Sequence, residues 1–138
     1  MLRIIDLLNQ KNHYLEKFYT LNELELLNFS QDDFNNLDVF YNGREKILET
    51  ILYIDTEISK VEFPSIVENA QLRTQISESF AVKDEYVNRI LAQDLEILSC
   101  IESKKSNIIR ELWEIKKAKK VFNGYKSPTF KNRLNEEL

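Results

Sequence analysis

Side chains of the kinds that catalyse reactions or bind metals are few in this sequence. His13 is the only histidine and Cys100 the only cysteine, which excludes a histidine-rich metal site and an internal disulfide. His13 is more typical of a surface or half-buried histidine than of a general base. Cys100 precedes Ile101 and lacks a Cys-x-x-Cys partner, which is more typical of a buried thiol than of a reactive one.

The carboxylates, glycines and aromatic residues predict no reactive site either. The sequence contains no Glu-x-x-His pair, and Gly43 and Gly124 are too far apart to form a phosphate-binding loop. Trp113 and the six tyrosines fit helix packing better than an aromatic cofactor box. We therefore expect no catalytic residue, no cofactor, no metal ligand and no enzymatic activity.

The most informative pattern is a long series of apolar residues at alternating steps of three and four near the C-terminus. No Gly or Pro interrupts residues 84–123, and a helix of this length would extend roughly 60 Å. Such a stripe needs a long partner from the same chain, a second copy or a client protein. The series is Val87, Leu91, Leu98, Ile101, Ile108, Leu112, Ile115 and Phe122, with Asp94, Lys105 and Lys119 at its three polar positions.

The same spacing predicts two earlier helices, at about 3–29 and 33–61. Asn12 and Asn22 occupy apolar-series positions in the first, where polar residues cost stability but fix register, and Arg44 interrupts the series in the second. The segment 30–33 is predicted to form a turn and an N-cap, so the two helices should pair as an antiparallel hairpin. Gly43, inside the second helix, costs about 1 kcal/mol relative to Ala and permits either a close helix crossing or a mild kink.

The rest of the chain predicts two further helices. Pro64 ends the second helix, and Ser65 with Glu68 forms a capping box for a short third helix at about 65–79. The pattern changes phase over 80–83 before the long final helix at about 84–122, which Gly124 should end. The expected fold is all-α: an antiparallel helical hairpin, a short helix and a long C-terminal helix in a coiled-coil-like bundle. We expect one helical domain over 1–126 and a mobile tail over 127–138.

Composition narrows the class of protein. Two Gly and two Pro argue against a β-sandwich, and 43% apolar with 30% charged residues is typical of a folded globular chain. The longest apolar runs are too short to span a membrane. Asp6 interrupts the apolar stretch at the N-terminus, which therefore lacks the order of a signal peptide. These features favour a cytoplasmic protein.

The net charge of −4 is unevenly distributed. Residues 31–103 carry six Lys/Arg and fifteen Asp/Glu, whereas residues 104–126 carry eight Lys/Arg and two Glu. The basic stretch can attract a nucleic acid or an anionic surface, or it can pair with the acidic part of one bundle. We favour a solvated or intramolecular role over nucleic-acid binding, because no helix-turn-helix or RNA-binding motif accompanies the lysines.

A Leu-rich first helix, a short acidic turn, a second helix with Arg-Glu-x-x-Leu and a long last helix that ends in lysines and a tyrosine follow one another along the chain. The residues that carry this order are Tyr14-Leu15, Leu26-Leu27, Asp32-Asp33-Phe34, Leu37, Arg44-Glu45-Lys46-Ile47-Leu48, Ile90-Leu91, Asp94 and Tyr125. Together these segments resemble the flagellar type III secretion export chaperones of the FlgN and FliT type. The resemblance spans roughly residues 5–126, and no motif separates the two families.

The resemblance implies a small cytoplasmic helical chaperone for flagellum biogenesis that needs no nucleotide or metal. Chaperones of this type bind the C-terminal helical segment of a late export substrate, either a hook–filament junction protein or the filament-cap protein. They prevent premature assembly and deliver the client to the export gate or its associated ATPase. In FlgN-type proteins the tyrosine that follows the last helix contributes to gate contact, and in this sequence only Tyr125 matches it.

The long apolar stripe is the expected client-binding surface, since an amphipathic client segment can lie along it as a substitute helix. More apolar positions line the last helix than one hairpin needs to cover. Tyr125 follows Gly124 and either folds back over the end of the bundle or projects as an anchor for the export gate. The predicted client-binding residues are Leu98, Ile101, Ile108, Leu112 and Ile115.

Two other functions remain compatible with the sequence. A generic coiled-coil adaptor or structural protein would self-associate as a long dimer without an unfolded client, so a homodimer is one expected partner. A regulator that binds nucleic acid would use residues 104–126 and show salt-dependent DNA binding, although we expect no nucleic-acid partner.

Overall fold

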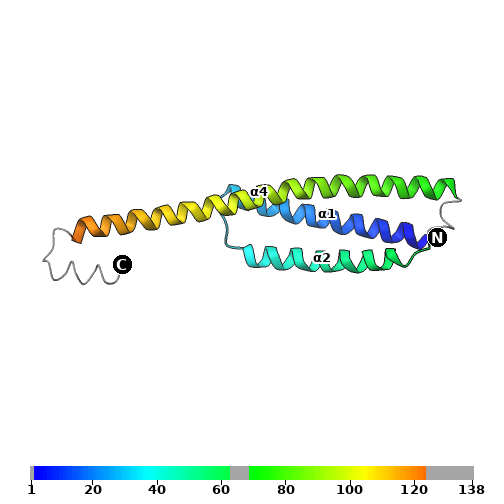
Figure 1. Ribbon diagram of the computed structural model, residues 1–138, viewed down its shortest axis with the longest axis horizontal. Helices are drawn as coiled ribbons and strands as arrows, with labels where there is room; N and C mark the ends of the chain where they lie inside the picture. Colours follow the sequence, from blue (N-terminus) through cyan, green and yellow to red (C-terminus); the bar gives the residue numbers. More distant parts are fainter. Residues whose placement is uncertain (1, 63–68, 124–138) are drawn as a thin grey trace. The chain divides into compact units, whose positions relative to one another are not determined.

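The computed structural model describes residues 2–62 and 69–123, which contain three helices and no strand. These helices are α1 (Leu2–Ser30), α2 (Leu37–Ser59) and α4 (Ala70–Asn123), shown in Figure 1. The all-α class is therefore confirmed. The chain divides into two compact units, residues 1–97 and 98–138. The expectation of one domain over 1–126 stays a prediction.

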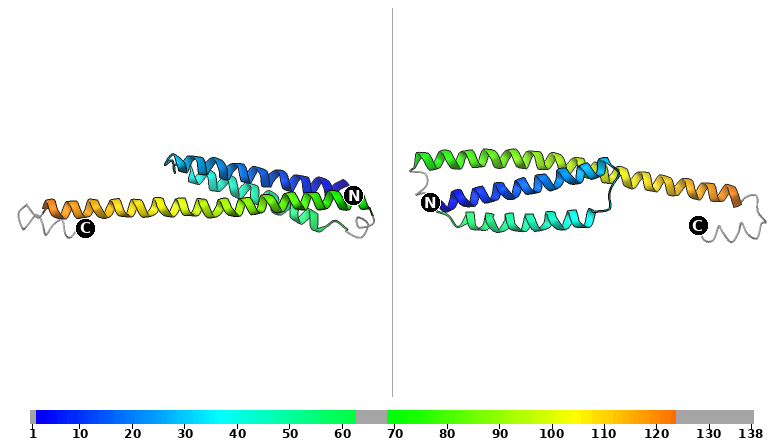
Figure 2. Two further views of the ribbon diagram at one scale, coloured as in Figure 1. Left: turned by 90° about the horizontal axis from the view of Figure 1, so that it is seen from above. Right: turned by 180° about the vertical axis from the view of Figure 1, so that it is seen from behind.

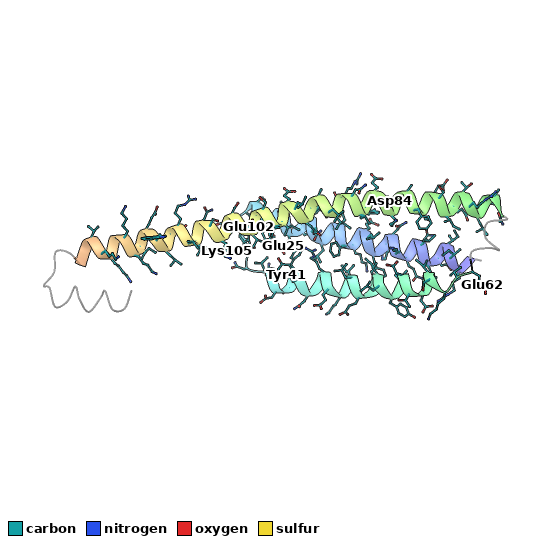
Figure 3. The ribbon with its side chains drawn as sticks, viewed as in Figure 1. Glu25, Tyr41, Glu62, Asp84, Glu102 and Lys105 are labelled. Carbon is teal, nitrogen blue, oxygen red and sulfur yellow. The ribbon has the colours of Figure 1, made fainter. Side chains whose placement is uncertain are left out.

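The first unit contains α1, α2 and the 70–97 part of α4, which lie along one another (Figure 2). Side chains from all three fill the space between them (Figure 3). Full burial of one such apolar side chain contributes about 1.5–3 kcal/mol, so these contacts hold the three segments together. One cluster joins Ile4, Leu8 and Leu72, and a second joins Leu15, Phe18, Ile51 and Ile90.

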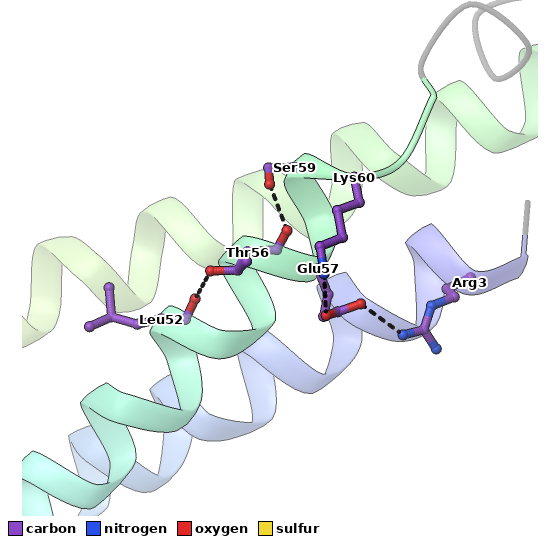
Figure 4. A network of polar contacts seen from close by, with 6 residues as sticks. All are labelled: Arg3, Leu52, Thr56, Glu57, Ser59 and Lys60. Carbon is purple, nitrogen blue, oxygen red and sulfur yellow. Dashed lines mark hydrogen bonds and ion pairs between the residues drawn. The ribbon is translucent and has the colours of Figure 1, made fainter.

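Polar contacts at one end of the first unit confirm that α1 and α2 are antiparallel (Figure 4). Glu57, near the end of α2, accepts hydrogen bonds from Lys60 Nζ at 3.1 Å and from Arg3, near the start of α1, at 3.3 Å. These donors, with Lys60 the stronger influence, hold the pKa of the Glu57 carboxyl below its usual value. Further along, Lys11 pairs with Asp55 at 2.7 Å.

Gly43 lies where α2 approaches α1 closely. A Cβ atom added at Gly43 would stand 3.3 Å from Cδ2 of Leu21 on α1, which is a tight contact. The predicted role of this glycine in a close helix crossing is consistent with this geometry.

The predicted boundary between a short third helix and the last helix, with its phase change over 80–83, is wrong. Residues 70–79, assigned to the third helix, and residues 80–83, assigned to the break, all belong to the continuous helix α4. The predicted capping box at Ser65 and Glu68 lies outside the described residues. Asn69 caps α4 instead, because its Oδ1 accepts the N–H groups of Gln71 at 3.0 Å and Leu72 at 3.2 Å.

The apolar series predicted for the last helix is also not the one that α4 buries in the first unit. Leu91, a member of that series, is 57% exposed, whereas Ile90 and Ile97 are buried. The buried series begins at Leu72. From Tyr86 on, each of its members precedes a position of the predicted series by one residue, so the two series lie about 100° apart around the helix. We call it the inner track: Leu72, Ile76, Ser79, Lys83, Tyr86, Ile90, Gln93 and Ile97.

The connection between α1 and α2 forms the predicted turn, but the turn does not cap α2. Asp32 has a φ of 58°, and its N–H donates to the carbonyl of Phe29 while the N–H of Asp33 donates to the carbonyl of Asn28. This is the Schellman arrangement that ends a helix, and the ring of Phe34 stacks on Phe29 with centroids 4.4 Å apart. Because the turn residues end α1 in this way, α2 begins at Leu37 rather than at about residue 33.

The left-handed backbone at Asp32 generates a testable prediction. We expect Asp32→Gly to be more stable than Asp32→Ala by about 1 kcal/mol, because only glycine adopts positive φ without steric cost. Both variants remove the carboxylate, so their difference isolates the backbone. The measurement is chemical denaturation of each variant. At Asp6, an exposed position inside α1, the order of the same pair should reverse; equal stabilities at Asp32 would contradict the prediction.

Candidate partner-binding surface

A layer of buried polar side chains determines which face of α4 contacts the hairpin. Asn22 on α1 is completely buried and donates from Nδ2 to Oε1 of Gln93 on α4 at 3.0 Å. Gln93 Nε2 in turn donates to the carbonyl of Tyr19 at 3.1 Å and to Oε1 of Glu23 at 2.8 Å. An unpaired buried amide costs about 1–3 kcal/mol, so a rotated α4 that removed Gln93 from this layer would be penalised.

The predicted roles of the polar residues on α1 and α2 agree with their contacts. Asn12 donates to the carbonyl of Ser79 on the inner track at 3.1 Å. Arg44 on α2 pairs with Asp94 Oδ1 at 3.1 Å, and its guanidinium lies over the rings of Phe18 and Phe40. Asn12, Asn22 and Arg44 therefore each contact a partner on another helix, as residues that fix register do.

Glu25 is a buried carboxyl next to this layer. Its side chain is 5% exposed, and its Oε1 has no hydrogen-bond partner among the described residues. Burial raises the pKa of the Glu25 carboxyl above its usual value; a hydrogen bond with Asn28 opposes the rise, and the charge of Asp33 adds to it. At neutral pH the folded state therefore bears the cost of a buried charge that the unfolded chain solvates.

We predict that Glu25→Gln raises the melting temperature at neutral pH. Because the folded pKa is raised, the native protein takes up a proton before the unfolded chain does as the pH falls. The melting temperature of the wild type should therefore approach that of the variant as the pH falls. The difference between the two melting temperatures should shrink towards about pH 4.5. The measurement is thermal unfolding across this range, with Glu16→Gln, at an exposed position on α1, as the matched control. A pH-independent difference would contradict the prediction.

The second unit presents the predicted client-binding residues on the surface of α4. Leu112 and Ile115 are each 53% exposed and Ile108 is 46% exposed, while Ile101 is half-buried. Their three- and four-residue spacing places them on one face of the helix, which we call the outer stripe: Leu98, Ile101, Ile108, Leu112 and Ile115. The structure therefore brings all five predicted residues onto one face. Tyr125, the predicted gate contact, lies outside the described residues.

The outer stripe is wider than predicted. Trp113 is 66% exposed rather than packed between helices, and Ile109, four residues earlier, is half-exposed. Both lie one residue beyond members of the stripe, so they extend it to one side. The signal was available, because Ile108-Ile109 and Leu112-Trp113 are adjacent apolar pairs. Trp is one of the residue types, with Tyr and Arg, that are enriched among those that dominate binding energy at interfaces.

The remaining candidate sites offer little chemistry. His13 is exposed, as predicted, while Cys100 is half-buried rather than fully buried. Among residues 2–62 and 69–123, no group of three or more His, Cys, Asp and Glu side chains is placed to hold a metal ion. An open hollow of about 350 Å³ lies between α1 and α2, lined by His13, Glu16, Lys17, Thr20, Leu21, Leu24 and Ile47.

Comparisons with known proteins add no assignment. Protein-family models, curated proteins and solved structures yield no match to the chain. Within the described residues, no helix is both long and apolar enough to cross a membrane.

Proposed function

We propose that the protein is a non-enzymatic chaperone that holds an amphipathic helix of a client protein along the outer stripe. One observation carries this proposal: Leu98, Ile108, Leu112 and Ile115 are about half exposed on one face of a single helix. An exposed apolar face of this length commonly marks a protein interaction site. Helix-in-groove recognition uses such three- and four-residue spacing.

The resemblance to FlgN- and FliT-type proteins supplies the proposed client. It is the C-terminal helical segment of a late flagellar export substrate, either a hook–filament junction protein or the filament-cap protein. Binding in the cytoplasm would cover the client's assembly surface until delivery to the export gate or its ATPase. The proposed gate contact at Tyr125 rests on the sequence resemblance alone.

We predict that Ile108→Glu with Leu112→Glu weakens client binding by about 100-fold or more, since each side chain loses roughly 1.5–3 kcal/mol of apolar burial. Leu112→Glu places a carboxylate four residues before Lys116, a spacing that supports the helix. The measurement is calorimetric titration with the junction and cap proteins of the source organism. Leu27→Glu is the matched control, because Leu27 is 56% exposed and belongs to α1 rather than to the outer stripe.

Thermal unfolding of the same variants separates a binding role from a packing role. The double variant should melt within a few degrees of the wild type, because exposed positions contribute little to stability. If the double variant instead loses much of its stability, these residues are core and the client binds elsewhere. Normal affinity for both clients in a well-folded double variant would reject the outer stripe as the binding surface.

A further inference from the structure

We propose that the protein self-associates by packing the outer stripe of one copy against an acidic, apolar face of α2 and α4 in a second copy. The occupant of that face is thus residues 98–123 of another molecule. The proposal goes beyond client binding and does not depend on it, because it concerns the protein alone.

The receiving face lies within the first unit, around the ion pair between Arg44 on α2 and Asp94 on α4. The two side chains are only partly buried, so the pair marks a seam at the surface. Residues three or four positions away share the face of a helix, which places Leu48 beside Arg44 and Leu91 beside Asp94. Further exposed apolar residues extend the receiving face by one or more helical turns. We call this the α2–α4 face: Tyr41, Leu48, Leu52, Phe80 and Leu91.

Acidic side chains follow the α2 side of this face. Asp38, Glu45 and Glu49 are exposed and lie three residues before Tyr41, Leu48 and Leu52, respectively. Arg44 is engaged by Asp94, and Lys83 on α4 is engaged by Asp84 at 2.7 Å. Residues 1–97 as a whole carry nine Lys/Arg and eighteen Asp/Glu. The α2–α4 face therefore suits an amphipathic helix with basic residues among its apolar ones.

The second unit supplies a helix of that chemistry. Residues 98–123 carry seven Lys/Arg and three Glu. Lys105 and Lys119 occupy positions within the outer stripe itself, and Lys116 follows Leu112 by four residues on the same side. The lengths also agree: α2 has 23 residues, so it and residues 98–123 each extend about 35–39 Å at 1.5 Å per residue.

Charge favours this arrangement over pairing of two outer stripes. A parallel, in-register pair would place Lys105 and Lys119 opposite the same residues of the other copy, where like charges destabilise. Any pairing of two stripes also joins two basic helices. Packing of the outer stripe on the α2–α4 face joins opposite charges. In a two-fold dimer this contact can form twice, because each copy can offer its outer stripe to the α2–α4 face of the other copy.

Two complementary variants of the full chain test the proposal. The first, the face variant, is Glu45→Lys with Glu49→Lys; the second, the stripe variant, is Lys105→Glu with Lys119→Glu. Sedimentation velocity measures self-association of each variant alone, of their equimolar mixture and of the wild type at low and high salt. The control variant is Asp6→Lys with Glu16→Lys, which makes the same charge change at exposed positions on α1.

We expect the wild type to dimerise and to dissociate as salt increases, because exposed charges are screened. Each variant alone should lose at least about tenfold in dimer affinity through like-charge contacts. The mixture should recover the wild-type affinity, since each variant complements the other, and the control variant should behave as the wild type. Circular dichroism checks that each variant is folded; if the stripe variant is not, Lys105→Gln with Lys119→Gln replaces it.

Three outcomes would overturn the proposal. The first is a wild type that is monomeric at low salt. The second is a face variant that dimerises as the wild type does, which would indicate pairing between outer stripes. The third is a mixture that fails to recover affinity although both variants are folded. None of these outcomes involves a client, so the proposed chaperone function is tested separately.

Discussion

The hydrogen bond between Asn22 and Gln93 is the constraint on which the rest of the first unit depends. Hydrophobic burial alone does not determine which way α4 faces the hairpin, because two apolar tracks run along it one residue apart. The inner track contains Ile90 and Ile97, and the neighbouring track contains Val87 and Leu91. On the neighbouring track, Asp94 only accepts from Asn22, at 3.4 Å, whereas Gln93 on the inner track accepts from Asn22 and also donates to the carbonyl of Tyr19. The polar pair thus specifies the buried face, and the exposed face follows from that choice.

The sequence was sufficient to predict the hairpin, because its two helices show one dominant apolar series each. Arg44 was recognised as an interruption, and Asn22 as a residue that fixes register, from their positions alone. The partners of both residues were not predictable, since Gln93 and Asp94 lie more than forty residues away along the chain from either residue. Contacts over such separations depend on how the helices are rotated about their axes.

The prediction of α4 failed for a related reason. Its inner track includes Ser79, Lys83 and Gln93, so the sequence pattern favours the neighbouring, more regularly apolar series. At residues 80–83 the neighbouring track becomes more apolar than the inner track, which gives the pattern an apparent change of phase. The helix itself continues unbroken through these residues. The predicted members of the candidate site were nevertheless placed on one face, because the spacing from Leu98 to Ile115 is regular. Trp113 was missed because a lone Trp within a helical pattern more often marks a core position.

Mutations in the inner track and mutations in the outer stripe of α4 have different consequences. Changes at Ile90 or Gln93 alter how firmly the first unit is held together, and they leave the residues of the outer stripe untouched. Changes at Leu112 or Trp113 alter the shape and polarity offered to other molecules, with little effect on the packing around Ile90. Selection can therefore act on recognition and on stability almost independently, although both properties are encoded in a single helix. A protein built this way can acquire a new binding preference through a few surface substitutions without first having to rebuild its interior.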